Sequence, residues 1–483
     1  MFVYKFNFIF SGGAICKWVL VGIFLLGFSV QIRANSINET DSLVLQIDDL
    51  FSQILIYHPV AKQANLLSEN AKQQIRLAKG GFDPKLSSDY DTKQFKGKDY
   101  YSLWKSELKV PVWIGGIDLK AGYERNTGEF LNRQNDTDSE KGLAFAGISV
   151  PIGQGLFIDK RRAAIKQAEI FESLAEAEKV KMINKLLLQV AKDYWTWYFN
   201  YHKFRLYQNG YELALFRFDA VKIRVRQGDL AKLDSIEAMI TLQQRKIDLE
   251  NASVEFQNSK LLLSNHIWGP EEVPLELSNN FIPAHNLPES FSDDPIEDLY
   301  EYARNNHPEI QKIRLKIEGL SIDERLAKEM LKPTLNLNYN FLSRSGTPIE
   351  TVTFSEDYKF GVAFNMPIFL RKERAKVKQT GIKIDQTNLE RIRLEREILN
   401  DLYVIYNDML NLERTLEMQE KMVNNYRRML SGERQKFFNG ESSVFYVNVR
   451  EGKLIESEVK LYNMQHKYAK SQATLRWAAG LGM

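Results

Sequence analysis

The chain has 483 residues, and its composition already excludes several classes of protein. Its 65 basic and 62 acidic residues leave a net charge of +3, which excludes the clustered basic excess of a nucleic-acid-binding protein. The mean hydropathy of −0.35 excludes a polytopic helical membrane protein. Aromatic residues make up 12% of the chain, whereas it has only 27 glycines and 13 prolines. This combination indicates long uninterrupted elements rather than a loop-rich enzyme.

Residues 1–34 have the pattern of a cleaved export signal. Two lysines precede the apolar run 18–30, and residues 32–34 form an acceptable cleavage site. An uncleaved anchor helix is the alternative, but the run is short for a membrane span. The single cysteine, Cys16, lies inside this segment. The mature chain is therefore expected to lack disulfides, thiolate metal sites and a cysteine nucleophile.

The rest of the chain is organised as a tandem duplication. The sequence Ile47–Leu50 returns as Ile296–Leu299, and further residues of the first copy recur in the same register. The segment between the copies contains four prolines, which forbid a continuous helix and indicate a crossover. We therefore predict a first repeat at 35–268, a crossover at 269–292 and a second repeat at 293–483.

Each repeat is predicted to contain a helix, strands, a very long helix, a tight turn and a last helix. In the first repeat, Thr40 or Asp41 is suited to cap a helix that runs to Lys79. In the second repeat, Asp293 or Asp294 is suited to cap a helix in whose first turn a proline follows. A break is expected inside each of these helices at a His-Pro pair, His58-Pro59 and His307-Pro308.

The long helices give the strongest periodic signal, over about 158–226 and 370–438. Apolar residues recur there with alternating spacings of four and three, which is the heptad pattern of a coiled coil. At 1.5 Å per residue each helix would be about 100 Å long. The seams include Leu187, Val190, Tyr194, Trp197 and, further along, Leu215 and Phe218 in the first helix, and Leu402, Ile405, Met409 and Leu412 in the second. A flanking apolar set predicts that the first helix packs on two sides: Leu186, Trp195, Tyr198 and Tyr207.

Strands with one apolar and one amide-rich face are predicted at 335–341 and 358–366. Two interpretations fit this alternation, a half-buried hairpin of a soluble domain or the wall of a membrane barrel. The export signal and the length of the helices favour the barrel.

In this order of elements, and in several short motifs, the chain resembles the TolC-type outer membrane efflux protein family over about residues 40–483. The motifs are two strand ends, two basic helix starts and two tip turns: 150–152, 366–368, 161–163, 373–375, 228–229 and 440–441. The resemblance implies a mainly α fold with a transmembrane β-barrel, built as a homotrimer whose helices form a periplasmic tunnel. It also implies a passive exit duct in the outer membrane of a Gram-negative-type cell, serving tripartite efflux or type I secretion. The partners would be a periplasmic adaptor, an inner-membrane pump and outer-membrane lipid.

The first repeat departs from the family pattern, because 67 positions separate Pro84 from Pro151 whereas 34 separate Pro333 from Pro367. The surplus contains a second hairpin-like unit within residues 98–126. Two outcomes stay open: the hairpin adds strands to the usual twelve of the trimer, or it projects outward.

The tips of the long helices carry the one candidate functional constellation. The resemblance implies that the two turns dock the adaptor: Gly228, Asp229, Gly440 and Glu441. Acidic residues often line the pore mouth of the family six and nine positions beyond the second turn glycine, where this chain has Tyr446 and Val449. The equivalent positions of the first repeat are Asp234 and Glu237. These carboxylates either form a ring that attracts cations or are surface groups paired with Lys232 or Arg245.

No pattern for an enzyme or a cofactor emerges from the sequence. Six histidines are scattered without metal-ligand spacing, and neither a phosphate loop nor a nucleophile elbow is present. We therefore expect no catalytic residue, cofactor or metal. The competing hypothesis is a periplasmic coiled-coil adaptor or scaffold without a barrel.

Overall fold

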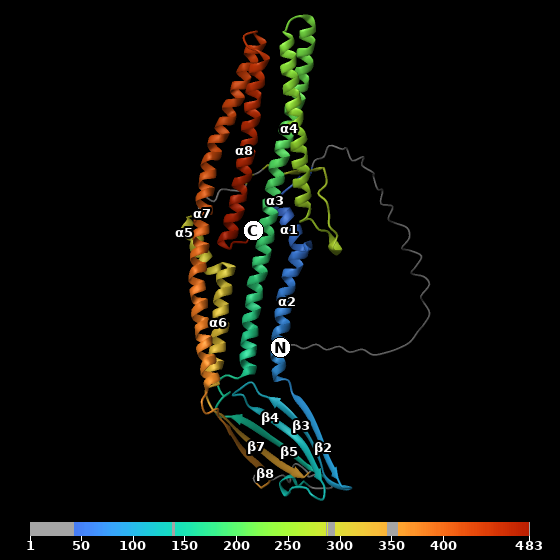
Figure 1. Ribbon diagram of the computed structural model, residues 1–483, viewed down its shortest axis with the longest axis vertical. Helices are drawn as coiled ribbons and strands as arrows, with labels where there is room; N and C mark the ends of the chain where they lie inside the picture. The colour runs from blue at the N-terminus through green and yellow to red at the C-terminus, as the bar shows by residue number, and fades with distance from the viewer. Residues whose placement is uncertain (1–42, 138–140, 286, 288–294, 345–355, 483) are drawn as a thin grey trace, which may run out of the picture. The chain divides into compact units, whose positions relative to one another are not determined.

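The computed structural model describes residues 43–137, 141–285, 287, 295–344 and 356–482 (Figure 1). The expected export signal and the four candidate helix caps Thr40, Asp41, Asp293 and Asp294 lie outside these residues. The chain divides into two compact units, 1–43 and 44–483, and the helices and the large sheet belong to the second.

The first helix of each half is interrupted at its His-Pro pair, as predicted. In the first half, α1 (Ile47–Tyr57) is followed by α2 (Pro59–Lys79), and His58 Nδ1 accepts a hydrogen bond from the backbone N–H of Val60 at 3.1 Å. In the second half, α5 (Ile296–Asn306) is followed by α6 (Pro308–Glu329), and the equivalent bond runs from Glu309 N–H to His307 Nδ1 at 3.2 Å. Each histidine thus caps the helix that its proline begins.

The predicted starts of these helices need correction. α1 begins at Ile47 rather than after Asp41, because residues 43–45 form the short strand β1 (Leu43–Leu45). The carbonyl of Leu45 accepts a hydrogen bond from Ala284 N–H at 3.2 Å, next to β6 (Phe281–Pro283) of the crossover. In the second half, Pro295 is the capping residue itself and α5 begins one residue later.

The long helices agree with the predicted ranges to within two residues. They are α3 (Lys160–Gln227) and α7 (Arg371–Phe438), of 68 residues each, and they lead into α4 (Lys232–Ser264) and α8 (Val444–Ala479). Asp159 starts α3, because its Oδ1 accepts from the N–H of Arg162 at 2.8 Å. Among the described residues, none of the helices combines the length and the apolarity that a membrane span requires.

The heptad seams form the core of the helical part. Val190, Tyr194 and Trp197 are at most 1% exposed and pack with residues of α1 and α4. On α7, Leu402 and Met409 are fully buried against α8. The flanking residues Leu186, Trp195 and Tyr198 are buried as well and Tyr207 is partly buried, which confirms packing of α3 on two sides.

Towards the tip, the predicted seam of α3 is wrong at Leu215, although the seam residue Phe218 packs against an apolar cluster there. Leu215 is 39% exposed, whereas the buried positions are Gly210, Ala214 and Val221. Small residues are needed because α8 approaches closely: a Cβ on Gly210 would lie 2.9 Å from Ile455 Cδ1. A seam defined by large side chains therefore misses this interface.

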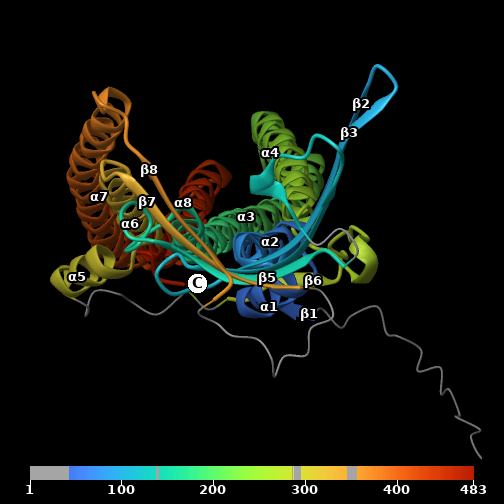
Figure 2. The same ribbon diagram turned by 90° about the horizontal axis from the view of Figure 1, so that it is seen from below.

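Within the described ranges, six strands form one curved antiparallel sheet at one end of the helices (Figures 1 and 2). They are β2 (Lys85–Phe95), β3 (Lys98–Pro111), β4 (Asp118–Thr127), β5 (Leu143–Pro151), β7 (Thr334–Arg344) and β8 (Tyr358–Asn365), in that spatial order. The surplus hairpin of the first repeat corresponds to β3 and β4, which pair with β2 and β5 on either side. It therefore adds two strands to the sheet of the chain.

Candidate functional site

One face of the sheet is apolar and exposed. Successive residues of a strand point to opposite faces and register partners share a face. By this rule Leu337 shares a face with its partners Val150 and Val362, and Leu119 shares it with Val110 and Ile148. Several of these side chains are widely exposed: Ile148 43%, Leu119 44%, Phe360 56%, Val362 56% and Phe364 66%.

The opposite face is charged and more enclosed. Lys105 contacts Glu107 at 3.1 Å and Glu124 at 3.4 Å, and Lys109 contacts Asp118 at 2.9 Å. The three carboxylate side chains are only 14–24% exposed. Asparagines of β7 continue this face, and Lys120 donates to Asn338 Oδ1 at 3.4 Å across β5.

This distribution is the reverse of that in a water-soluble sheet, where the apolar face is covered and the charged face is exposed. A contiguous apolar surface of this kind marks an interaction with protein or membrane. A membrane barrel requires this arrangement, with apolar residues towards lipid and polar residues towards a wet lumen. The sheet also has two open edges, β2 and β8, which would leave unpaired backbone groups in hydrocarbon if the chain stayed alone.

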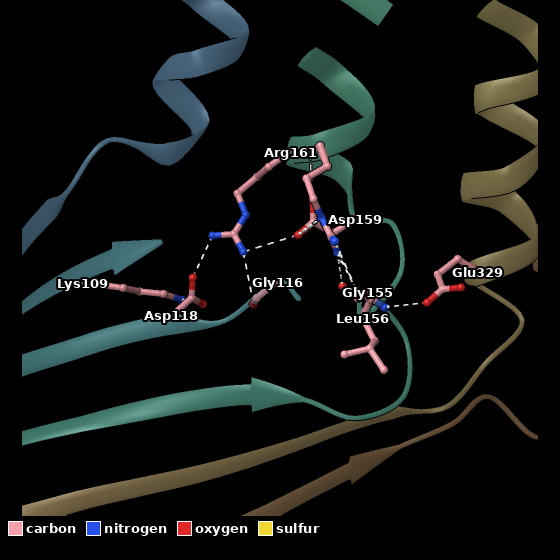
Figure 3. Close-up of polar contacts among 9 residues, drawn as sticks. Lys109, Gly116, Asp118, Gly155, Leu156, Asp159, Arg161 and Glu329 are labelled. Atoms are coloured by element: carbon pink, nitrogen blue, oxygen red, sulfur yellow. Dashed lines mark hydrogen bonds and ion pairs between the residues drawn. The ribbon is translucent and has the colours of Figure 1, made fainter. Parts of the chain in front are cut away.

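An ion-pair cluster joins the sheet to the start of α3 (Figure 3). Arg161 Nη1 donates to Asp118 Oδ1 at 2.8 Å, and Arg161 also reaches the carbonyl of Gly116, in the turn between β3 and β4, at 3.5 Å. Asp159 lies 3.6 Å from the same guanidinium. The basic helix start of the motif 161–163 therefore fixes the surplus hairpin to the helix.

The same junction ties the second half to the first. Arg162 donates to the carbonyls of Gly155 and Leu156, which shapes the loop before α3. The N–H of Gly155 then donates to Glu329 Oε1 at 3.2 Å, at the end of α6 (Figure 3). Glu329 is 6% exposed and also contacts Lys332 at 2.7 Å. The loops of both halves thus share one polar cluster where the sheet ends.

The two tip turns have the same geometry. Gly228 and Gly440 have φ values of 87° and 80°, the left-handed conformation that glycine adopts most readily. In each turn the residue after glycine donates back to the carbonyl five residues earlier, from Asp229 to Arg224 at 2.9 Å and from Glu441 to Lys436 at 2.8 Å. Both turns are exposed, so Gly228, Asp229, Gly440 and Glu441 are free to meet a partner.

The candidate pore-mouth carboxylates are not in the ion pairs that the surface hypothesis expects. Asp234 Oδ2 accepts from the N–H of Ala231 at 3.1 Å and so caps its own helix. Arg245 instead contacts Asp248 at 3.8 Å. Partial burial, together with the negative charge of Asp234, raises the pKa of Glu237. Within the described ranges neither carboxylate has a basic partner.

The other two pore-mouth candidates, Tyr446 and Val449, both lie on α8 but have different surroundings. Tyr446 is 52% exposed and its ring packs edge-on against Phe445 at 5.5 Å between centroids. Val449 lines a groove together with residues of α3 and α4, among them Tyr207, Arg245 and Asp248. Val449 therefore faces the neighbouring hairpin of its own chain.

Sequence reasoning missed a buried ion cluster that connects the two tip hairpins. Glu451 on α8 has a 5% exposed side chain and accepts from Arg217 on α3 and, at 3.3 Å, from Arg434 on α7. An apolar cluster closer to the tips adds to this contact, with Val221, Ala238 and Val444 buried. The heptad pattern does not predict that Glu451 is buried, because a carboxylate on a helix is normally expected to face solvent.

Histidines gather where α1, α3, α4 and α8 pack. Burial lowers the pKa of His466 to about 3, assisted by the charges of Lys470 and Lys467. The pKa of His202 falls to about 4 through burial and the nearby His285. These groups are neutral at physiological pH, and in the described part of the chain no three His, Cys, Asp or Glu side chains are placed to hold a metal ion.

Comparison with known proteins agrees with this architecture. Residues 299–481 match the outer membrane efflux protein family. No curated protein matches the sequence.

Several solved structures of outer-membrane channels have the same fold. The Campylobacter jejuni channel CmeC superimposes with a TM-score of 0.63 at 13% identity, covering 90% of this chain and 85% of that one. VceC of Vibrio cholerae superimposes with a TM-score of 0.62 at 14% identity, covering 90% of this chain and 96% of that one. For the open state of MtrE of Neisseria gonorrhoeae, the TM-score is 0.64 at 14% identity, and 90% of this chain and 89% of that one are covered.

The alternative of an adaptor without a barrel is not favoured by these comparisons, and the matched family is one of channels rather than enzymes. Residues 299–481 thus match the outer membrane efflux protein family, and the described part of the chain has the fold of the solved outer-membrane proteins CmeC, VceC and MtrE.

Proposed function

We propose that three copies of this chain form a passive exit duct, which spans the outer membrane with its strands and reaches through the periplasm with its helices. The observation that carries the proposal is the exposed apolar face of a sheet with two open edges. The sheet cannot close on itself, whereas three copies would pair every edge and turn every apolar face towards lipid.

The helices support the same assembly. On α4, the exposed residues Ile240, Ile247 and Val254 repeat every seven positions, which is the pattern of a coiled-coil seam without a partner. On α7, Met422 and Met429 are exposed with the same spacing. Figure 2 shows α4 and α7 on opposite sides of α3 and α8, so α4 of one copy would meet α7 of the next in a ring.

The tips are the proposed docking site for a periplasmic adaptor and, through it, an inner-membrane pump. They lie about 100 Å of helix away from the strands, on the side where a periplasmic partner would approach. Their backbone turns are exposed and held in one conformation by paired hydrogen bonds. Gly228, Asp229, Gly440 and Glu441 would form this contact.

Fractionation and mass measurement test the proposal. The full chain expressed in a Gram-negative host should be found in the outer-membrane fraction, and in mild detergent it should have three times the mass of one chain. The trimer should resist dissociation until it is heated. A monodisperse monomer with full helicity, or recovery in the soluble periplasmic fraction, would contradict the assembly and favour a scaffold without a barrel.

A further inference from the structure

We propose that the surplus hairpin β3–β4 is a segment of the barrel wall, which gives the trimer eighteen strands, and that its paired charges line the lumen, where their balance keeps the channel from strongly preferring cations or anions. This inference rests on the proposed function, because it assumes that three copies close one barrel.

The hairpin has the two faces of a wall strand along most of its length. On one face, β3 presents Ser106, Leu108 and Val110 and β4 presents Leu119, Ala121 and Tyr123, while towards the far end of the hairpin Trp104 lies opposite Arg125 on the same face. On the other face, between Lys105 and Glu124, it presents six charged residues together with one proline and one glycine: Lys105, Glu107, Lys109, Pro111, Asp118, Lys120, Gly122 and Glu124. A hairpin that projects into water would have no reason to keep one face free of charge over the three register pairs from Ser106–Tyr123 to Val110–Leu119.

The residues next to the hairpin pack closely against it. Phe145 of β5 lies across Gly122 of β4, and a Cβ on Gly122 would be 2.5 Å from the ring of Phe145. Lys105 lies over the same ring, 5.5 Å from its centroid. Gly116 in the turn of the hairpin is equally confined, because a Cβ there would lie 2.7 Å from the carbonyl of Gly155. Such close fits, together with the bond from Arg161 to Asp118, place the hairpin in the sheet rather than beside it.

Strand direction allows closure with these strands included. The order β2-β3-β4-β5-β7-β8 is antiparallel at each step, so β2 leads away from the helices and β8 leads back to them. If β8 of one copy lies beside β2 of the next, that pair is antiparallel as well. Six strands from each of three copies give eighteen, a size at which barrels enclose an aqueous channel.

The charges of the hairpin are balanced and alternate in sign. Along β3 the order is Lys105, Glu107, Lys109, and β4 places Glu124 opposite Lys105 and an aspartate beside Lys109. A lumen lined by such pairs is polar without a strong preference for either sign of ion. Removal of the carboxylates alone would leave unpaired lysines at three symmetric places and favour anions.

Planar-bilayer recordings of the trimer test this inference. The double variant Glu107→Gln/Glu124→Gln should shift the zero-current potential in a salt gradient towards anion preference. The matched control Ser88→Ala/Ser106→Ala removes two hydroxyl groups that form a hydrogen bond on the apolar face at 2.8 Å, and it should leave the potential unchanged.

Disulfide formation between engineered cysteines tests whether the hairpin pairs with β5, independently of any conductance measurement. Ala121 and Ala146 are register partners on β4 and β5, so Ala121→Cys/Ala146→Cys should form an intrachain disulfide on oxidation. Ala121→Cys with Phe341→Cys is the control, because Phe341 lies one strand further on and is out of reach.

The possible results distinguish failure of this inference from failure of the proposed function. A trimer without the Ala121–Ala146 disulfide would place the hairpin outside the wall and overturn the inference, while the proposed function stands. A disulfide with an unchanged zero-current potential would overturn the assignment of the charges to the lumen. Failure of the unmodified chain to form a trimeric channel would instead contradict the proposed function.

Discussion

The two faces of β8 allow a matched pair of substitutions at one depth. Val362 lies in the middle of the strand on the apolar face and is 56% exposed, whereas Ala363 is its neighbour on the polar face, opposite Asn336. In the proposed barrel, Val362→Lys places an ammonium group in lipid, and Ala363→Lys places the same group in the wet lumen. Only the first should prevent assembly.

The expected magnitude follows from the symmetry. A lysine at the middle of the lipid face of a barrel costs about 2–4 kcal/mol, and three copies give about 6–12 kcal/mol per trimer. Even the lower value corresponds to roughly a 10⁴-fold change in the assembly equilibrium. Ala363→Lys should cost little, because its neighbours are polar and water is present.

Heat-modifiable migration on gels and the yield in the outer-membrane fraction measure this difference. Val362→Lys should give little trimer and Ala363→Lys a yield close to that of the unmodified chain. Circular dichroism of both variants controls for folding of the helices, to which neither residue belongs. Equal trimer yields for the two variants would refute the assignment of the apolar face to lipid.

Three further predictions concern the helical part. Gly440→Val should leave the trimer yield normal but abolish efflux, because a β-branched residue strains a turn with positive φ; full efflux would argue against docking at this turn. If Asp234 and Glu237 form a ring, Asp234→Asn/Glu237→Gln should lower cation preference in single-channel recordings, and an unchanged preference would make them ordinary surface groups. Burial holds the pKa of His466 below its value in the unfolded chain. The free energy of unfolding should therefore decrease as the pH falls below about 6.5, by about 1–2 kcal/mol at pH 5. Thermal unfolding of His466→Phe should show a smaller loss, and an identical pH dependence would exclude this histidine as its source.

The sequence predicts those parts of the fold that depend on local patterns. The long helices, the breaks at His58 and His307 and the strands of the second half follow from heptads, His-Pro pairs and period-two alternation, and the structure confirms them. Likewise, the family resemblance rested on the order of such elements. The division into two repeats at 35–268 and 293–483 stays a prediction, although the order of helices is the same in both halves.

What the sequence did not reveal depends on contacts between distant segments. Glu451 is buried because arginines from two other helices meet it, and nothing near position 451 predicts this. The seam of α3 changes from large to small residues where α8 approaches, which a search for apolar side chains cannot detect. The place of the surplus hairpin was open for the same reason, since Arg161 and Phe145 decide it from outside the hairpin.

Thiol labelling in purified outer membranes tests the central claim most directly, namely that this sheet is a membrane wall with a wet inner face. The only cysteine of the chain is Cys16, so single cysteines can be placed at neighbouring positions of β8, Lys359→Cys on the polar face and Phe360→Cys on the apolar face. A charged, water-soluble maleimide should label the first and not the second, whereas a lipid-soluble quencher should reach a probe at the second only. Equal labelling of both positions by the water-soluble reagent would show that the sheet lies in water and would contradict the account.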